Sequence, residues 1–525
     1  MRWWSGIILA AYTLSVYEHS WAAAVPFIPQ TDQDKNAVVV HNANHIFNAI
    51  HSSMRQWGSS LNHNGMSFFM AQVPAGTQFY HGSPFQEPVE GMEWLAFEPE
   101  HASFFATRIK RRNDTDDNDG SEVESGDLVQ PPSGHDGGIM LQHPILDTRI
   151  KPPRYDITPG WLHTYRTKHN LPLLYIDGMS AGKTERGTLD SQDALLLNVT
   201  RNQRDGFWDF ERARRLCKLS NDKWGGKIKG FIRMEAGFEI IMCSFVENVD
   251  FISAVRTGRS LPGGEESEPT EPVRQHLMVW IKAISARYDD IGGDRVKLDH
   301  ENFITSFAYD LDLFNDGDDL PRLENLSVAS LDKVRNDVDT MVNNWDTFDS
   351  GAINWQSITD MVVERYAKEL PYLVSDSLDT SEAFLHELST ILHVFIDSDH
   401  RNSTAEVERC INQFVPTGIK HSGSIAGRAV EAVTRKICSG LFAAFDSNVS
   451  VSESKKKLRS LMTYLDWTTW KKCGDCALDE ICFIPVWPIG SEEDRIHPRC
   501  RNATDIEQRP GGWQVEEFMD MRGTI

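Results

Sequence analysis

The chain has 525 residues, of which 40% are hydrophobic, and it carries a formal net charge of -23 at pH 7. A chain of this length provides for about two to four domains with a large apolar core. Such acidity excludes nonspecific binding to nucleic acid or to an anionic membrane, because both require a cationic surface.

The first residues are typical of a secretory signal peptide. Arg2 precedes an apolar stretch from Trp3 to Val16, and residues 22–24 form an A-x-A cleavage site. We therefore expect residues 1–24 to be removed, so that the mature chain begins at Val25. No later apolar run approaches the roughly 20 residues that a membrane span needs. The expected location is extracellular, with the cell wall or a vacuole as alternatives.

Candidate glycosylation sites support this expectation. N-x-[ST] sequons are acceptors for N-linked glycans in secreted proteins. Six of them are spread along the chain, at Asn113, Asn198, Asn325, Asn402, Asn448 and Asn502. Their spread predicts that most regions keep a face open to solvent.

Residues 25–258 are predicted to form an α+β domain. Apolar side chains in 45–57 have helical spacing, and a second helix is expected at 210–219. Extended segments are expected at 66–73, 77–80, 172–177, 230–233 and 238–245. Residues 112–138 are acidic and rich in Gly, Pro and Ser, which predicts a disordered insertion. The triplet Lys110-Arg111-Arg112 before it is either a processing site or an exposed basic cluster.

Helical periodicity begins after a linker at 259–272, which is rich in Pro, Gly and charged residues. Three apolar stripes predict amphipathic helices. They consist of Val273, Leu277, Trp280, Ile281, Ile284 and Tyr288; of Ile358, Met361, Val362, Tyr366 and Leu370; and of Leu385, Leu388, Leu392 and Phe395. The predicted architecture is an α+β N-terminal module, an all-α helical domain over 273–465 and a Cys-rich tail over 466–525.

The cysteines are even in number, which favours disulfides in an oxidising compartment and leaves their pairing open. They are Cys217, Cys243, Cys410, Cys438, Cys473, Cys476, Cys482 and Cys500. The last four follow the pattern C-x2-C-x5-C-x17-C and could instead supply four thiolates to a zinc ion. Oxidation competes with metal loading in the secretory pathway, so disulfides are the main expectation.

Two other motifs fail on spacing. Residues 178–184 read GMSAGKT after a predicted strand, but three residues separate the glycines where a nucleotide-binding loop needs four. Main-chain N–H groups of this loop could still bind an anion. His386 and His393 lie seven positions apart on a predicted helix, whereas two zinc ligands on one turn are four apart. No metal site is expected from either motif.

One set of predicted strands and helices, which carries His81 and Glu239, suggests an enzymatic reaction. Residues 76–80 form a predicted strand that runs into His81-Gly82-Ser83, and residues 94–97 lead into a predicted helix at 100–106. Far downstream, Glu239 opens a predicted strand at 240–245. This order resembles the ADP-ribosyltransferase superfamily over residues 66–255. The resemblance implies a mixed sheet and NAD as the substrate, with no other cofactor.

The resemblance also implies roles for individual residues. His81 would bind the NAD ribose, backbone groups of Gly82 would hold the nicotinamide amide, and Phe104 would stack on the nicotinamide ring. Ser83 would also belong to the NAD-binding residues. Glu239, with His81, would be catalytic, because a fixed carboxylate stabilises the oxocarbenium character that develops when the glycosidic bond breaks. Capture by water would make an NAD glycohydrolase, and capture by a protein side chain a transferase.

The sequence departs from the family pattern at two positions, and two other functions are also considered. Phe104 stands where the family usually has Tyr, and Gly237 stands where arginine-specific members carry a second acidic residue, although Glu235 is nearby. Arginine modification is therefore not expected.

One alternative is a noncatalytic secreted or wall-associated glycoprotein with a degenerate α+β module and an exposed apolar patch on its helical domain. The other is a secreted hydrolase with paired carboxylates. The phrases WLAFEPEHA and LLYIDGMSAGKT also resemble segments of secreted proteins of filamentous fungi.

Overall fold

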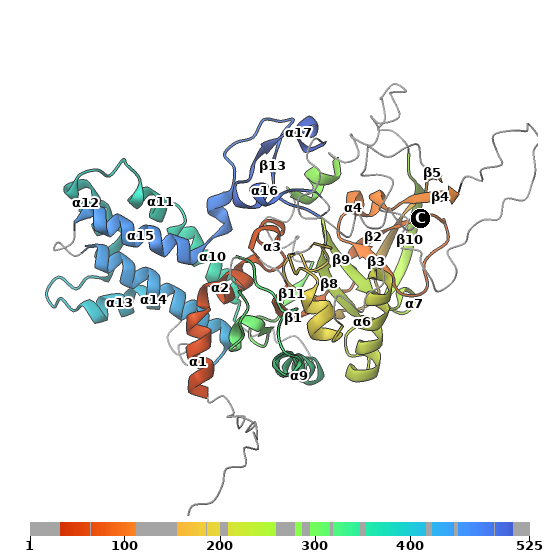
Figure 1. Cartoon of the computed structure of the whole chain (residues 1–525), viewed down its shortest axis with the longest axis horizontal. Coiled ribbons are helices and arrows are strands. Elements are labelled where there is room, and N and C mark those ends of the chain that lie inside the picture. The colour runs from red at the N-terminus through yellow and green to blue at the C-terminus, as the bar shows by residue number, and fades with distance from the viewer. Residues whose placement is uncertain are drawn as a thin grey trace, which may run out of the picture.

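The computed structural model describes residues 32–62, 65–111, 155–184, 186–199, 208–258, 279–285, 295–314, 319–346, 353–415, 423–445, 450–487 and 489–507. The predicted signal peptide, acidic insertion and linker lie outside these residues. A sheet occupies one end of the molecule and a group of helices the other, and the C-terminal tail lies against both (Figure 1). The predicted order of α+β module, helical region and Cys-rich tail is confirmed.

A ten-stranded mixed sheet forms the N-terminal region, with the order β10-β6-β2-β3-β9-β8-β7-β1-β11 and β12 beside β1. Its described strand pairs are antiparallel except β7 with β8, which are parallel. The strands are β1 (Ser67–Val73), β2 (Gln78–Ser83), β3 (Glu93–Ala96), β6 (Trp161–Thr167), β7 (Leu171–Ile176), β8 (Gly230–Met234), β9 (Phe238–Met242), β10 (Val249–Arg256), β11 (Lys297–Leu298) and β12 (Ile304–Thr305). A separate hairpin pairs β4 (Thr107–Arg111) with β5 (Tyr155–Pro159). The predicted extended segments lie on β1, β2, β7, β8 and β9.

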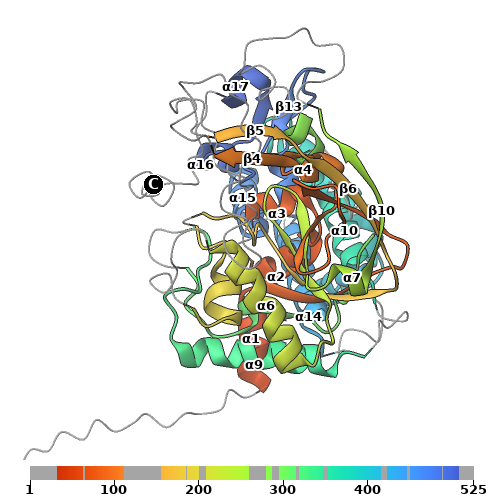
Figure 2. The ribbon, with the colours of Figure 1, turned by 90° about the vertical axis from the view of Figure 1, so that its right-hand side faces the viewer.

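Several helices and turns lie on or beside this sheet. They are α1 (Asp32–His41), α2 (Ala43–Ser52), α3 (Gln56–Asn62), α4 (Pro99–Phe104), the π-helix η1 (Ser191–Leu196), α6 (Asp209–Trp224), α7 (Phe245–Asn248), the short 3-10 turn η4 (Ser306–Ala308) and α9 (Val328–Asn344). Figure 2 shows α6 beside α9, with β10 at the free edge of the sheet. The helix predicted for 45–57 is two helices instead of one. The chain turns at Met54, whose φ is 54°, and the Met54 N–H donates to the Tyr175 hydroxyl.

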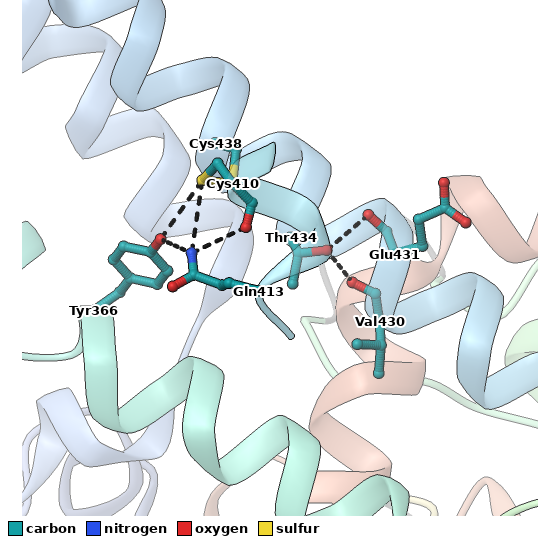
Figure 3. Close-up of a disulfide and its surroundings, with 7 residues drawn as sticks. All are labelled: Tyr366, Cys410, Gln413, Val430, Glu431, Thr434 and Cys438. Atoms are coloured by element: carbon teal, nitrogen blue, oxygen red, sulfur yellow. Dashed lines mark hydrogen bonds between the residues drawn. A yellow bond between two sulfur atoms is a disulfide. The ribbon is translucent and has the colours of Figure 1, made fainter. Parts of the chain in front are cut away.

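The helical region has helices at two of the predicted stripes, which are buried except for Met361 (47% exposed) and the half-buried Leu385. It comprises α10 (Trp355–Tyr366), α11 (Glu369–Val374), α12 (Ser381–Leu392), the 3-10 turn η5 (His393–Phe395), α13 (Ser403–Asn412), α14 (Ile425–Phe445) and α15 (Val451–Leu465). The long helix α14 lies at its centre and packs against α12, α13 and α15. A disulfide between Cys410 and Cys438 joins α13 to α14, and the Gln413 amide beside it donates to the Tyr366 hydroxyl and the Cys410 carbonyl (Figure 3).

Two groups of elements connect the regions. The N-terminal helices α1 and α2 pack against α14, and β11 and β12, which follow the expected linker in sequence, complete the sheet beside β1. The remaining stripe is described only over 279–285, where Trp280, Ile281 and Ile284 are buried. The division of the chain into domains at the predicted boundaries remains a prediction.

The tail begins after α15 with η6 (Thr468–Lys471) and continues through β13 (Ile481–Phe483), α16 (Glu492–Ile496), β14 (Arg499–Arg501) and α17 (Ala503–Glu507). Apolar side chains of β13 pack against Trp57 of α3 and against Trp280. Two disulfides, Cys473–Cys482 and Cys476–Cys500, cross-link the tail. Cys217 pairs with Cys243, so all eight cysteines form disulfides and that prediction is confirmed.

The sequon asparagines that the structure describes are exposed or half-buried, as a glycan acceptor requires. The side chains of Asn198, Asn325 and Asn402 are exposed, Asn502 is half-buried, and Asn113 and Asn448 lie outside the described residues. Among the helices that the structure describes, none is both long enough and apolar enough to cross a membrane.

Candidate functional site

A group of buried and half-buried charges lies at the end of β8 and β9. We call it the ionic cluster, and it consists of Lys183, Asp209, Arg233, Glu235 and Glu239. The hairpin register sets two of its members face to face, because Arg233 and Glu239 are Cα partners and Met234 pairs with Phe238 before the turn. Directly opposed residues of an antiparallel pair project to the same face of the sheet.

Two further segments complete the ionic cluster. The loop after β7 is tied to the end of β8 by a hydrogen bond from the Ala181 N–H to the Met234 carbonyl, 2.8 Å, and this places Lys183 beside the hairpin. Helix α6 crosses the same face, where its residue Phe210 contacts Trp94, and its first residue is Asp209. Three segments distant in sequence therefore converge on one point of the sheet.

The contacts form a closed network. Arg233 donates from Nε to the Glu239 carboxylate at 2.7 Å and from Nη2 to the Asp209 carboxylate at 3.1 Å. Lys183 donates to the Glu235 carboxylate at 2.7 Å and lies 3.4 Å from Asp209. The Arg233 side chain has 0% exposure and that of Glu239 has 6%. Charges this deeply buried are tolerated only when they are paired.

A second layer supports the ionic cluster from α6 and η1. Arg212 donates to Asp209 at 2.9 Å and to Asp193 at 2.6 Å and 3.0 Å. Gln192 accepts from Arg233 at 3.1 Å. Asp209 therefore contacts three cations, and it is the residue through which the two layers are joined.

The two carboxyl groups that contact Arg233 titrate very differently. Burial alone would raise the pKa of Asp209, but the charges of Arg233, Lys183 and Arg212 outweigh it and hold that pKa well below its usual range. Burial raises the pKa of Glu239 to about 7, although Arg233 opposes this rise. Near neutral pH, Asp209 is ionised while Glu239 is close to its titration midpoint.

Aromatic and imidazole groups border the ionic cluster. The Trp487 ring of the tail lies 4.6 Å from the Lys183 ammonium. In α4, His101 accepts at Nδ1 from the Trp280 indole N–H at 3.1 Å, so its Nε2 carries the proton. That Nε2 and the Trp94 indole nitrogen are buried without a hydrogen-bond partner among the described residues.

The structure does not bring His81 and Glu239 together. Tyr80 is the Cα partner of Ala96 on β3, and Ala96 is the partner of Glu239 on β9, so Tyr80 and Glu239 share a face. Successive strand residues project to opposite faces. His81 therefore faces away from Glu239.

His81 has its own partners on that other face. Its Nδ1–H donates to the Trp94 carbonyl at 2.8 Å, and its ring lies 6.0 Å from that of His163 and 5.8 Å from that of Phe245. Burial lowers the pKa of His81 to about 4. The ring is therefore neutral at physiological pH.

The other predicted site residues also have structural partners. A Cβ at Gly82 would lie 2.1 Å from the Ala102 carbonyl, so only glycine fits beneath α4 at this position. The Ser83 hydroxyl accepts from the Phe85 N–H at 3.1 Å. The Phe104 ring stacks on Trp280, with centroids 4.9 Å apart and planes at 16°.

Sequence reasoning missed most of the ionic cluster. Lys183 belongs to the GMSAGKT segment, whose sequence is close to that of a phosphate-binding loop. Its Ala181 and Gly182 N–H groups are engaged by the Met234 and Met179 carbonyls, and its lysine binds carboxylates. A hairpin pattern was available in Arg233-Met-Glu-Ala-Gly-Phe-Glu239, where a turn around Gly237 sets the two end residues opposite each other. Asp209 and Arg212 carried no local signal.

Comparison with known proteins places the ionic cluster inside a matched region. Residues 34–141 and 147–261 match the family described as the YPL277C N-terminal domain. The Saccharomyces cerevisiae proteins YPL277C and YOR389W are each 31% identical to the chain, over 220 and 227 residues. The matches cover 40% of this chain and 42% and 33% of the two yeast proteins, so the chain spans less than half the length of these relatives. No solved structure matches the chain significantly.

Proposed function

We propose that the chain is a noncatalytic secreted glycoprotein in which Glu239 is a structural carboxylate, and that it does not cleave NAD. The buried pair between Glu239 and Arg233, 2.7 Å apart, is the observation that carries this proposal. Secretion is supported by the predicted signal at 1–24, the six sequons and the four disulfides.

The electrostatics of that pair argue against catalysis of NAD cleavage. A catalytic carboxylate must hold a ribose hydroxyl and stabilise positive charge that develops on the sugar. The Glu239 carboxylate already accepts from Arg233, and the guanidinium places a full positive charge beside it. A cation at that distance opposes the development of a second positive charge nearby.

The partners of the other residues support the same conclusion. NAD cleavage needs the ribose-binding histidine and the carboxylate in one cavity. His81 and Glu239 project from opposite faces of the sheet, and the Phe104 ring is stacked on Trp280. The resemblance to ADP-ribosyltransferases would then be limited to the order of strands and helices and would not extend to NAD cleavage.

Exposed apolar side chains of the described residues lie on both regions. On the helical region they include Met361, Tyr372 and Val394. On the sheet they gather along the edge strand β10, where Phe251, Ile252 and Val255 are 38%, 49% and 60% exposed. The expected patch on the helical domain stays a prediction, and the edge of the sheet is a second place where apolar side chains are exposed.

A test of the proposal combines activity and stability. The purified chain is incubated with NAD and free nicotinamide is quantified, for wild type and for Glu239→Gln. We expect no release above buffer from either protein. We also expect Glu239→Gln to lower the free energy of unfolding by about 3 kcal/mol, because a buried pair is broken, while the exposed control Glu382→Gln changes it little. Release by wild type that Glu239→Gln abolishes would overturn the proposal.

A secreted hydrolase with paired carboxylates is the second candidate, and one observation favours it. The pKa of Glu239 is raised to about 7 while that of Asp209 is held low, and a separation of this kind assigns an acid and a base in carboxylate enzymes. The test is a panel of chromogenic glycosides. Hydrolysis that Glu239→Gln removes, in the absence of nicotinamide release from NAD, would favour this candidate over the first.

A further inference from the structure

The four cysteines of the tail gather at a small two-stranded sheet. Strands β13 and β14 are antiparallel, and Cys482 and Cys500 are Cα partners on them. The turn at 473–476 lies against this pair, and each of its two cysteines is bonded to one cysteine of the sheet, with 5.5 Å between the Cα atoms in both disulfides. A C-x-x-C turn over a cross-strand cysteine pair brings four sulfurs to one place.

The spacing of these sulfurs is close to that of a metal site. The Sγ atoms of Cys473, Cys476 and Cys500 lie within 4.8 Å of one another, and the Cys482 sulfur is bonded to that of Cys473. Tetrahedral zinc with thiolate bonds of about 2.3 Å would hold its sulfurs about 3.8 Å apart. Because Cys476 and Cys500 are bonded to each other, reduction would let these two sulfurs move apart to that spacing, while the Cys473 sulfur would move toward them by about 1 Å at most.

Two further features fit a metal-binding state. The Cys473 N–H donates to the Cys482 sulfur at 3.0 Å, and a hydrogen bond to sulfur favours its ionised form. The tail cysteines are all half-buried, whereas Cys410 and Cys438 have 0% exposure. A reductant therefore reaches the tail disulfides before the disulfide of the helical region.

We propose that the reduced tail binds one Zn²⁺ through Cys473, Cys476, Cys482 and Cys500. Reduction by a trialkylphosphine consumes one phosphine and one water per disulfide and yields two thiols and one phosphine oxide. Zinc binding then releases one proton from each of the four thiols. The tail keeps its cross-links in both states, as two disulfides when oxidised and as one metal centre when reduced.

The metal centre would stabilise the packing of the tail against the sheet region, because the tail contacts residues of that region. Side chains of β13 pack against Trp57 and Trp280, and Trp487 lies over Lys183 of the ionic cluster. Loss of both tail disulfides without a metal would release this packing. Zinc would hold it in place.

The experiment uses the full chain, reduced by limiting phosphine without oxygen and titrated with Co²⁺ alone. We expect the visible absorption of tetrahedral cobalt thiolate, saturating at one Co²⁺ per chain and bleached by one equivalent of Zn²⁺. The double variant Cys410→Ser/Cys438→Ser should keep this signal, and Cys476→Ser/Cys500→Ser should lose it.

Wild-type protein supplies a second measurement that does not depend on the folding of variants. Iodoacetamide labelling followed by mass spectrometry should show the four tail cysteines protected by Zn²⁺ in the reduced chain. Absence of the tetrahedral signal in reduced wild type, its persistence in Cys476→Ser/Cys500→Ser, or labelling of the tail cysteines that Zn²⁺ does not change would each overturn the proposal.

Discussion

The sheet region and the helical region share one apolar core but differ in the charges that lie within it. Between β8, β9 and α6 the sheet region encloses the ionic cluster, of which Arg233, Glu235 and Glu239 are buried and Lys183 and Asp209 are half-buried. At the centre of the helical region, the buried face of α14 is apolar apart from Thr434, whose hydroxyl donates to the Val430 carbonyl of its own helix (Figure 3). Buried charges need particular partners, whereas apolar faces need only volume and pattern. Substitutions should therefore be more selective in the sheet region than in the helical region.

The largest effect is expected at Arg233. Its replacement by Met leaves the Glu239 carboxylate and part of the Asp209 charge buried without their partner. We expect the free energy of unfolding in urea to fall by about 3–5 kcal/mol. The exposed control Lys457→Met should change it by less than about 0.5 kcal/mol. A loss at Arg233 no larger than at Lys457 would remove the contrast between the two regions.

The helical region should depend on its cross-link more than on any polar group. The disulfide between Cys410 and Cys438 spans 28 residues. Replacing both cysteines by Ala should cost about 3–4 kcal/mol, chiefly because the unfolded chain gains freedom. Urea unfolding of the double variant measures this cost. Stability equal to that of wild type would show that the packing of α13 on α14 suffices.

Acid should act on the sheet region through His81. Its pKa is lowered to about 4 in the folded chain, from an ordinary value near 6.5. Between these values the unfolded chain binds a proton that the folded chain does not, so stability falls as the pH is lowered, by up to about 1.4 kcal/mol per pH unit. His81→Phe should therefore flatten the pH dependence between 6.5 and 4.5, as unfolding at several pH values will show. An unchanged slope would contradict the burial of the ring.

The contribution of Glu239 to folding stability should change with pH in the direction opposite to that of His81. Its pKa is raised to about 7, so the folded chain binds the extra proton below neutral pH and the contribution to stability is lost as the pH rises through 7. Comparing the pH dependence of wild type and Glu239→Gln between pH 5 and 8 measures this term. Wild type should gain stability relative to Glu239→Gln as the pH is lowered from 8 to 5, and a difference that instead grows toward high pH would reverse the assignment.

The smallest effect is expected at a helix cap of the helical region. The Asn402 side chain accepts from the Ala405 N–H at 3.0 Å and begins α13. Asn402→Ala should cost about 1 kcal/mol. Asn325→Ala is the matched control, because Asn325 is also an exposed sequon residue and caps no described helix. Equal losses would attribute the effect to the missing glycan and not to the cap.

The two regions were also predictable to different degrees. The stripes on α10 and α12 and the strand segments were evident in the sequence, because periodicity is a local property. The interruption between α2 and α3 was not, since the turn at Met54 is stabilised by Tyr175 from a distant strand. The pairing of the cysteines likewise depends on tertiary contacts.

The candidate site depends even more on tertiary contacts that the local sequence does not predict. The sequence identified Glu239 and His81 by residue type and order, but the face on which each projects depends on the register through β3. The partners of Glu239 come from a loop, a hairpin and α6, and no local pattern links Asp209 to Arg233. A carboxylate selected by motif alone could therefore be catalytic or structural, and its ion-pair partner distinguishes the two.

Nicotinamide release from NAD tests the central claim most directly, because Glu239 cannot both serve as the catalytic carboxylate and be held by Arg233 solely for structure. We expect wild-type protein to release nicotinamide no faster than buffer, and Glu239→Gln to differ from wild type in stability alone. Release by wild type that disappears in Glu239→Gln, with the variant still folded, would contradict it.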